Sequence, residues 1–177
     1  MLLFRRNQKK NATPAGPAKP ARLGDVIFSL NDDWFIREDI GLDHHMIDYA
    51  VVSRFGLFTI FQQTASGTIT ANASSILVNG NPHDYIIKSI KMCNAMIESQ
   101  VKARAVPIAI FSSSEVHGLE ASGIKLLTAD QLLPYLMSHD MGTLSPRQIA
   151  EISKGLRSLE ASKPAVKVNR SPVALAQ

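Results

Sequence analysis

The sequence predicts an α/β domain whose mixed β-sheet is flanked by helices, and three observations carry this prediction. Two apolar stretches rich in β-branched and aromatic residues, 47–53 and 57–63, are separated by a tight turn, which is typical of antiparallel strands. A longer stretch, 83–104, repeats its apolar residues every three or four positions, as an amphipathic helix does. Another apolar stretch, 106–111, follows it. A helix between strands of one sheet indicates a crossover, so we expect parallel as well as antiparallel strands.

The first half of this region predicts a short helix and an antiparallel three-strand meander. Apolar residues at helical spacing predict a helix over 25–31, and 34–39 is a candidate for a short strand. Tight glycine-containing turns at 54–56 and 65–67 join the three strands of the meander, which are 47–53, 57–63 and 68–71.

The second half predicts the crossover helix, two further strands and two capped helices. Asn79-Gly80-Asn81-Pro82 predicts a loop before the helix 83–104. Cys93 falls on the apolar stripe of that helix, so we expect a small buried side chain and not a reactive thiol. Thr128 and Ser145 are expected to be the N-cap residues of the two later helices, and Pro146 follows Ser145 at the first helical position. The two strands are expected at 106–111 and 124–127.

The composition excludes a wholly disordered, collagen-like or coiled-coil chain, but the charge is unevenly distributed. Hydrophobic residues make up 45% of the 177 residues and charged residues 19%. The formal net charge is +4, yet residues 23–160 hold 10 basic and 15 acidic groups, a net charge of −5. The segments 1–22 and 161–177 contain no acidic residue and bury too little apolar surface to offset the entropy of ordering them. We therefore expect one domain, 23–160, between a disordered basic arm and a disordered tail.

Two sets of cations are candidates for binding. The basic arm is a candidate for contacting nucleic acid, or an acidic partner, through Arg5, Arg6, Lys9, Lys10, Lys19 and Arg22. Its composition fits a solvated linker equally well. The last helix offers Arg147, Lys154 and Arg157 to a protein partner. The simpler interpretation of that helix is that its apolar face docks on the sheet of the same chain.

Cysteine usage and hydropathy predict a cytoplasmic protein. Cys93 is the only cysteine, which excludes an internal disulfide and a cysteine-based zinc site and fits a reducing compartment. No uncharged apolar run approaches the roughly 18–20 residues of a membrane helix. The apolar start, 1–4, is too short for the core of a signal peptide.

Several short motifs occur in a recognisable order along 23–160. They are Gly24-Asp25 at the first helix, Ile47-Asp48 before Val51-Val52, Gly56-Leu57-Phe58-Thr59-Ile60 in the next strand, Ser66-Gly67 at the following turn, Asn81-Pro82 before the long helix and Leu144-Ser145-Pro146 at the last helix. This ordered set resembles the nuclease-related domain (NERD) family, a branch of the restriction-endonuclease-like fold. The resemblance implies that fold, and a setting in DNA handling or in a multi-protein assembly of a bacterium or mobile element.

The catalytic motif that the resemblance implies is incomplete in this chain. In such a nuclease, an Asp and a Glu on neighbouring strands hold Mg²⁺, and a Lys two residues after the Glu helps to activate water. The alignment places these three roles at Asp48, Phe61 and Gln63, and the Glu of the first helix at Asp25. A phenyl ring cannot coordinate a metal, and a neutral amide supplies no positive charge.

The resemblance therefore implies a non-catalytic pseudo-nuclease without metal or other cofactor. Such a protein would bind a protein partner, and DNA through its basic tails. One alternative is an active divalent-metal nuclease with an atypical motif, in which Gln62 or Gln63 is a weak oxygen ligand. Lys88 or Lys91 would then replace the missing lysine. Another alternative is an adaptor that contacts only protein.

Three other groups of polar residues predict loops and helix caps. His44-His45 lies near Asp48, but adjacent histidines point in different directions and seldom share one metal. His83-Asp84 opens the long helix, where an acidic residue favours the helix dipole. The segment 112–117 contains serine, glutamate and histidine, which are too close in sequence for a catalytic triad and lack a nucleophile-elbow motif.

Overall fold

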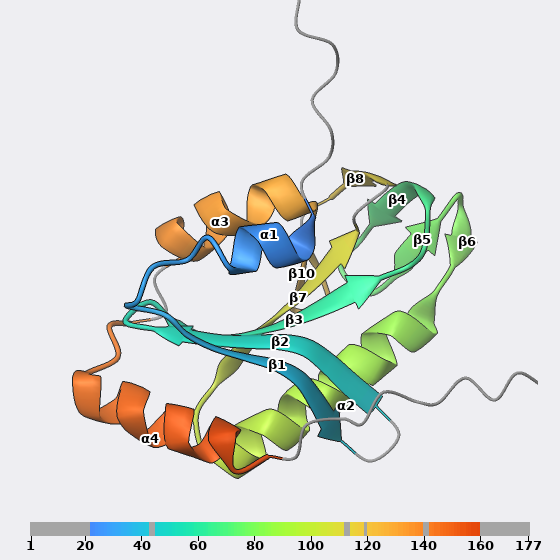
Figure 1. Cartoon of the computed structure of the whole chain (residues 1–177). Helices are drawn as coiled ribbons and strands as arrows, with labels where there is room; N and C mark the ends of the chain where they lie inside the picture. Colours follow the sequence, from blue (N-terminus) through green and yellow to red (C-terminus); the bar gives the residue numbers. More distant parts are fainter. Residues whose placement is uncertain (1–21, 43–44, 112–113, 119, 140–141, 160–177) are drawn as a thin grey trace, which may run out of the picture.

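The computed structural model describes residues 22–42, 45–111, 114–118, 120–139 and 142–159, and shows a large and a small β-sheet with four helices (Figure 1). The helices are α1 (Leu23–Ile27), α2 (Asp84–Val101), α3 (Ala129–Ser138) and α4 (Pro146–Arg157). The large sheet contains β1 (Phe35–Leu42), β2 (His45–Ser53), β3 (Gly56–Gln63), β7 (Ala105–Phe111), β9 (Glu120–Ala121) and β10 (Ile124–Leu127). The small sheet contains β4 (Gly67–Ala71), β5 (Ile76–Val78), β6 (Asn81–Pro82) and β8 (Ser114–His117).

The large sheet is mixed, as the sequence predicts. Its strand order is β1-β2-β3-β7-β10-β9. The pairs β1–β2 and β2–β3 are antiparallel, whereas β3–β7 and β7–β10 are parallel. Helix α2 lies on the connection between β3 and β7, so it is the crossover helix of the parallel pair. The predicted α/β class with helices flanking a mixed sheet is confirmed.

The meander consists of different strands from those that the sequence predicts. It is formed by β1, β2 and β3, while residues 68–71 belong to β4 in the small sheet. Asn79 explains the change of direction, because its Oδ1 accepts a hydrogen bond of 2.9 Å from the Thr68 N–H and its Nδ2 donates to the Ser66 carbonyl. These bonds turn the chain toward β5 instead of back along β3.

Three further predictions need correction. Residues 114–117, predicted as loop, form β8, which pairs in parallel with β4. The local sequence is polar and gives no strand signal, because the strand is formed by pairing with a segment over forty positions earlier. The first helix spans Leu23–Ile27 and not 25–31, since residues 28–30 continue as a turn. Part of the predicted loop 79–82 forms the two-residue strand β6.

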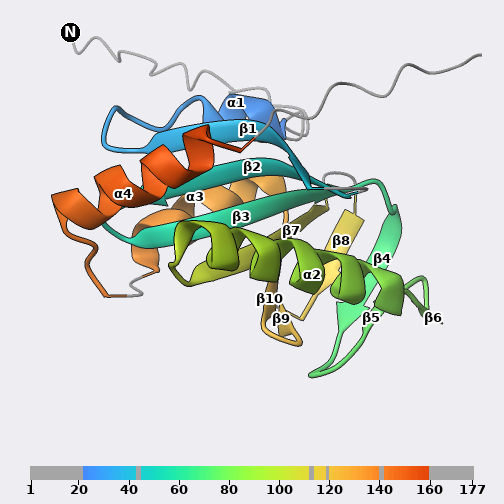
Figure 2. The ribbon, with the colours of Figure 1, turned by 90° about the horizontal axis from the view of Figure 1, so that it is seen from below.

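The helices form two layers, one on each face of the large sheet (Figure 2). Helices α2 and α4 bury Ile90, Ile97 and Leu156 against one face, whereas α1 and α3 bury Ile27 and Leu132 against the other. Cys93 lies on the buried side of α2 and is 1% exposed, so the prediction of a buried thiol is confirmed. No helix in the described part of the chain has the length and apolar character that crossing a membrane requires.

A buried polar pair attaches α2 to the centre of the sheet. Thr59 Oγ1 of β3 donates a hydrogen bond of 2.6 Å to Asn94 Oδ1 of α2, and both side chains are buried. Asn94 Nδ2 donates to the Ala105 carbonyl, and Glu98 Oε1 accepts from the Ala105 N–H at 2.8 Å. A buried polar group is costly unless it is hydrogen-bonded, so these bonds fix the position of α2 across β3 and β7.

Both later helices begin at the predicted cap residues. Ser145 Oγ accepts from the Gln148 N–H, and Gln148 Oε1 accepts from the Ser145 N–H at 2.9 Å, which is a capping box. Thr128 N–H likewise donates to Gln131 Oε1 at 3.0 Å.

Candidate functional site

The candidate site lies where β2 and β3 stop pairing. Their ladder runs from Ser53 opposite Gly56 to Tyr49 opposite Ile60, although both strands continue beyond it. At the next position, Asp48 Oδ2 accepts a hydrogen bond of 2.7 Å from the backbone N–H of Gln62. The fold thus places Asp48 beside the strand segment that contains Phe61 and Gln63.

The carboxyl group of Asp48 is in an unfavourable environment for its charge. Burial raises the pKa of Asp48, and the hydrogen bond from the Gln62 N–H opposes that rise. The charge of Asp39 also raises it. In the β1–β2 register, Glu38 lies opposite Tyr49 and Ile40 lies opposite Ile47, so Asp39 lies across from Asp48. The backbone of Asp39 is left-handed, with a φ of 53°. Asp48 therefore acts as a backbone acceptor facing a second carboxylate.

Phe61 is part of the hydrophobic core. Its side chain is 4% exposed and belongs to the apolar cluster between the sheet and the α2–α4 layer. It lies opposite Ala109 of β7, and Gln63 lies half-buried opposite Phe111. The aromatic ring of Phe61 fills space that a metal-binding carboxylate would need to share with water. Phe61 and Gln63 therefore supply no second charged oxygen next to Asp48.

Asp25 belongs to a helix and not to either of these two strands. It is exposed on α1, which packs against α3 on the face of the sheet opposite to α2. In the described ranges, no three His, Cys, Asp or Glu side chains are grouped so that they could hold a metal ion.

The other polar groups noted in the sequence form small separate contacts. His45 Nδ1 lies 3.2 Å from Ser89 Oγ and connects β2 to α2, while His44 lies outside the described residues. His83 contacts Tyr85, and Glu115 lies 3.8 Å from His117 on β8, where both side chains are exposed. Residues 112 and 113 lie outside the described residues, so the Ser-Glu-His segment is described only from residue 114.

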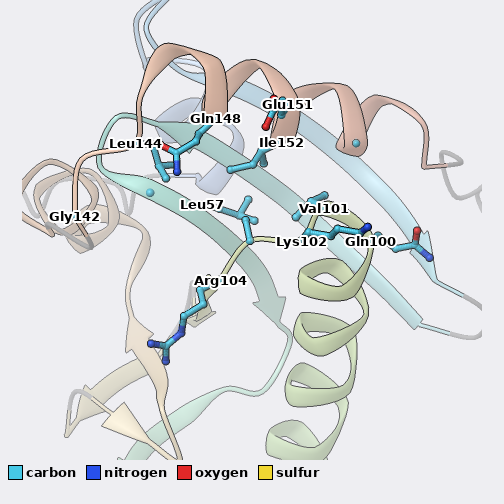
Figure 3. Close-up of a pocket in the computed structure, with 13 residues that line it drawn as sticks. Leu57, Gln100, Val101, Lys102, Arg104, Gly142, Leu144, Gln148, Glu151 and Ile152 are labelled. Carbon is cyan, nitrogen blue, oxygen red and sulfur yellow. The ribbon is translucent and has the colours of Figure 1, made fainter.

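A pocket of about 570 Å³ lies near the start of β3, at the other end of this strand from Asp48 (Figure 3). Leu57 and Ile152 contribute apolar surface, and Lys102 and Arg104 contribute cationic side chains. None of the four positions of the predicted catalytic motif lines it. The sequence gives no signal for this pocket, because β3, the end of α2 and α4 form it jointly from three distant segments.

The candidate binding cations have different environments. On α4, Arg147 Nε forms an ion pair of 2.9 Å with Glu151, Lys154 is exposed, and the guanidinium of Arg157 lies 4.9 Å from the centre of the Phe35 ring. The apolar face of α4 packs on its own sheet through Ile152 and Leu156. Of the basic arm only Arg22, which is exposed, falls within the described residues.

Comparison with protein-family models, with curated proteins and with solved structures finds no match for this chain.

Proposed function

We propose that this chain is a non-catalytic binding or accessory module with the restriction-endonuclease-like fold of the nuclease-related domain family, acting in DNA handling or in a macromolecular assembly. The observation that carries the proposal is the placement of Phe61 in the core beside Asp48, at the position where the family alignment requires a metal-binding Glu. The order of elements supports the fold, because a helix and three antiparallel strands precede a crossover helix and a parallel strand.

The chemistry of phosphodiester hydrolysis supports the non-catalytic part of the proposal. Mg²⁺ is held by hard anionic oxygens, and it stabilises both the attacking and the leaving oxygen. Of the motif positions at this end of β2 and β3, which are Asp48, Phe61 and Gln63, Asp48 alone has a carboxylate, and it already accepts the Gln62 N–H. The neutral amide of Gln63 supplies no positive charge for a hydroxide or for the developing phosphorane.

The partner of the module is proposed to be a protein, with DNA contacted through the basic tails. The net charge of −5 over residues 23–160 disfavours DNA over the domain surface as a whole, because phosphate binding depends on cationic groups. The proposed localisation is the cytoplasm, which fits the buried single cysteine.

A cleavage assay tests the non-catalytic role. The full chain is incubated with supercoiled and with linear DNA in Mg²⁺ and in Mn²⁺, beside Asp48→Ala and the control Asp130→Ala, which removes an exposed carboxylate of α3. We expect all three proteins to leave both DNAs intact. Metal-dependent cleavage that Asp48→Ala abolishes and Asp130→Ala retains would overturn the proposal in favour of an active nuclease with an atypical motif.

A further inference from the structure

We propose that the folded domain has its own surface for the phosphate backbone of double-stranded DNA, formed by α2, residues 102–104 and α4. This inference deepens the proposed binding role and rests on it. We call this surface the α2–α4 face. This face is separate from the basic arm, because it lies on the folded domain, whose net charge is negative.

The charge of the domain is divided between its two helical layers. Residues 84–104 and 146–157 contain seven Lys and Arg against three Asp and Glu. In the opposite layer, residues 23–34 and 129–138 contain four Asp and no Lys or Arg. Since the two layers lie on opposite faces of the large sheet, the negative net charge conceals one basic and one acidic surface (Figure 2).

The acidic residues of the α2–α4 face are already engaged. Glu151 pairs with Arg147, Glu98 Oε1 accepts the Ala105 N–H, and Asp84 Oδ1 accepts from Ser75 Oγ at 3.1 Å. Arg157 is exposed and contacts the Phe35 ring. The other cations of this face that have no ion pair or side-chain hydrogen bond within the part of the chain that the structure describes are also exposed, and they are Lys88, Lys91, Lys102, Arg104 and Lys154.

The spacing of these cations suits an extended polyanion. Lys88 and Lys102 are fourteen positions apart on and just after α2, which corresponds to about 21 Å at 1.5 Å per residue. Helix α4 lies alongside and adds Lys154, and it approaches α2 so closely that a Cβ on Gly155 would lie 3.1 Å from Val101 Cγ1. Duplex DNA carries about one charge per 1.7 Å of its axis, so it can engage all of these groups at once.

The face is less suited to an acidic protein than to DNA. The large hydrophobic side chains exposed on α2 are Tyr85 and Met92, which are two turns apart. A contiguous apolar centre is what distinguishes the core of a protein interface. The described chain also ends on this layer, where the Leu159 carbonyl accepts a hydrogen bond from the Arg37 side chain.

The test measures binding of the full chain to a labelled DNA duplex by fluorescence anisotropy over a salt series. The face variant carries K88Q, K91Q, K102Q, R104Q and K154Q, and the arm variant carries Gln at all six cations of the basic arm. The control D32N/D33N/D130N changes the acidic layer. Circular dichroism verifies that each variant is folded, which is expected because every substituted side chain described is exposed.

We expect the face variant to bind at least about tenfold more weakly than the wild type at low salt. Its salt slope should fall by about 0.9 for each phosphate that the variant no longer neutralises. The acidic-layer control should bind at least as tightly as the wild type. Wild-type affinity and slope in the face variant would overturn the inference and leave DNA binding to the basic arm.

Two other results would also overturn the inference that the α2–α4 face binds DNA. One is the absence of any binding by the wild type at low salt. The other is equal binding of the duplex and of poly-glutamate, which would mark the face as a docking site for acidic protein. Each of these outcomes leaves the proposed non-catalytic role untouched, since that role is judged by the cleavage assay.

Discussion

The carboxylate of Asp48 and the backbone N–H of Gln62 are joined by a hydrogen bond of 2.7 Å at the end of the β2–β3 ladder. The Asp48 side chain here accepts the hydrogen bond that a backbone carbonyl accepts elsewhere in the ladder. Burial removes water from the same carboxylate, which disfavours its charged form and raises its pKa. The interaction is therefore better described as a strand connection than as half of a metal site.

Asp48→Asn should preserve the strand connection and remove the partly buried charge. We expect its free energy of unfolding at neutral pH to equal or exceed that of the wild type. Asp48→Ala should cost about 1 kcal/mol, since it leaves the Gln62 N–H without its acceptor. Urea unfolding at pH 7 measures both differences, and equal destabilisation by Asn and Ala would contradict the backbone-acceptor role.

The pH dependence of this group has a defined sign. Because the pKa of Asp48 is raised in the folded state above 3.8, the folded protein binds the proton more tightly than the unfolded chain. The contribution of Asp48 to stability is thus smallest at neutral pH and grows as the pH falls through the raised pKa toward 3.8. The Asp48→Asn variant has no titrating carboxyl at this position, so any stability advantage that it has over the wild type at pH 7 should shrink as the pH is lowered to 4. A difference independent of pH would argue against a raised pKa.

Phe61 should behave as a core residue. Phe61→Ala leaves a cavity beside β7 and should lower the free energy of unfolding by about 3–5 kcal/mol. Phe61→Glu, which recreates the carboxylate of the family motif, should be more damaging because it buries an unpaired charge. The matched control is Phe28→Ala, whose ring is 62% exposed and whose loss should cost less than about 0.5 kcal/mol. Similar losses for the two alanine variants in urea unfolding would refute this placement of Phe61.

The Thr59–Asn94 pair should be energetically coupled. Thr59→Val or Asn94→Leu alone leaves a buried polar group without its partner, and each should cost about 1–3 kcal/mol. The double variant removes the donor and acceptor of this bond together, so its cost should be about 0.5–3 kcal/mol less than the sum of the single costs. A double-mutant cycle from urea unfolding measures this coupling, and strictly additive losses would show that the two side chains act independently.

Gly155 should be required for the close approach of α4 to α2. Gly155→Leu forces a side chain against Val101 and should destabilise the domain by about 1–3 kcal/mol through overpacking. The second substitution Val101→Ala should restore part of that loss. Ala150→Leu, on the exposed side of the same helix, is the control and should be close to neutral. If the Gly155 and Ala150 variants unfold at the same urea concentration, the helices do not pack closely there.

The sequence predicts the elements whose signals are local. Helix α4 begins at Ser145 and Pro146 because a capping residue and a residue with a fixed φ start a helix without help from the rest of the chain. The apolar stripe that includes Cys93 likewise indicates which side of α2 is buried.

Pairing between distant segments is what the sequence could not predict. β4 follows β3 after a short turn, yet its partners are β5 and β8, and the hydrogen bonds of Asn79 that redirect it join residues eleven and thirteen positions apart. β8 exposes Glu115 and His117 and has a single apolar residue, Val116, so its sequence resembles a loop. The pocket escaped prediction for the same reason, since its apolar and cationic residues come from segments that only the fold brings together.

The positions that align with the family's catalytic motif show a second limit of prediction from sequence. Asp48 lies beside the segment 61–63 because the two strands that local pattern predicts are neighbours in the sheet. The sequence could not show that the Asp48 carboxylate would accept a hydrogen bond from the Gln62 N–H, because a backbone amide has no sequence signature. Nor could it show that Asp25 would lie with α1 on the other face of the sheet from α2.

The left-handed backbone at Asp39 has a consequence for how copies of this chain behave in concentrated solution. β1 is one end strand of the large sheet, and an end strand with free N–H and C=O groups can recruit a strand from another molecule. The φ of 53° interrupts the regular pleat in mid-strand, and Glu38 and Asp39 put two exposed negative charges there. The opposite end strand, β9, has two residues. Both borders of the sheet thus discourage strand addition, which favours separate molecules over edge-to-edge aggregates.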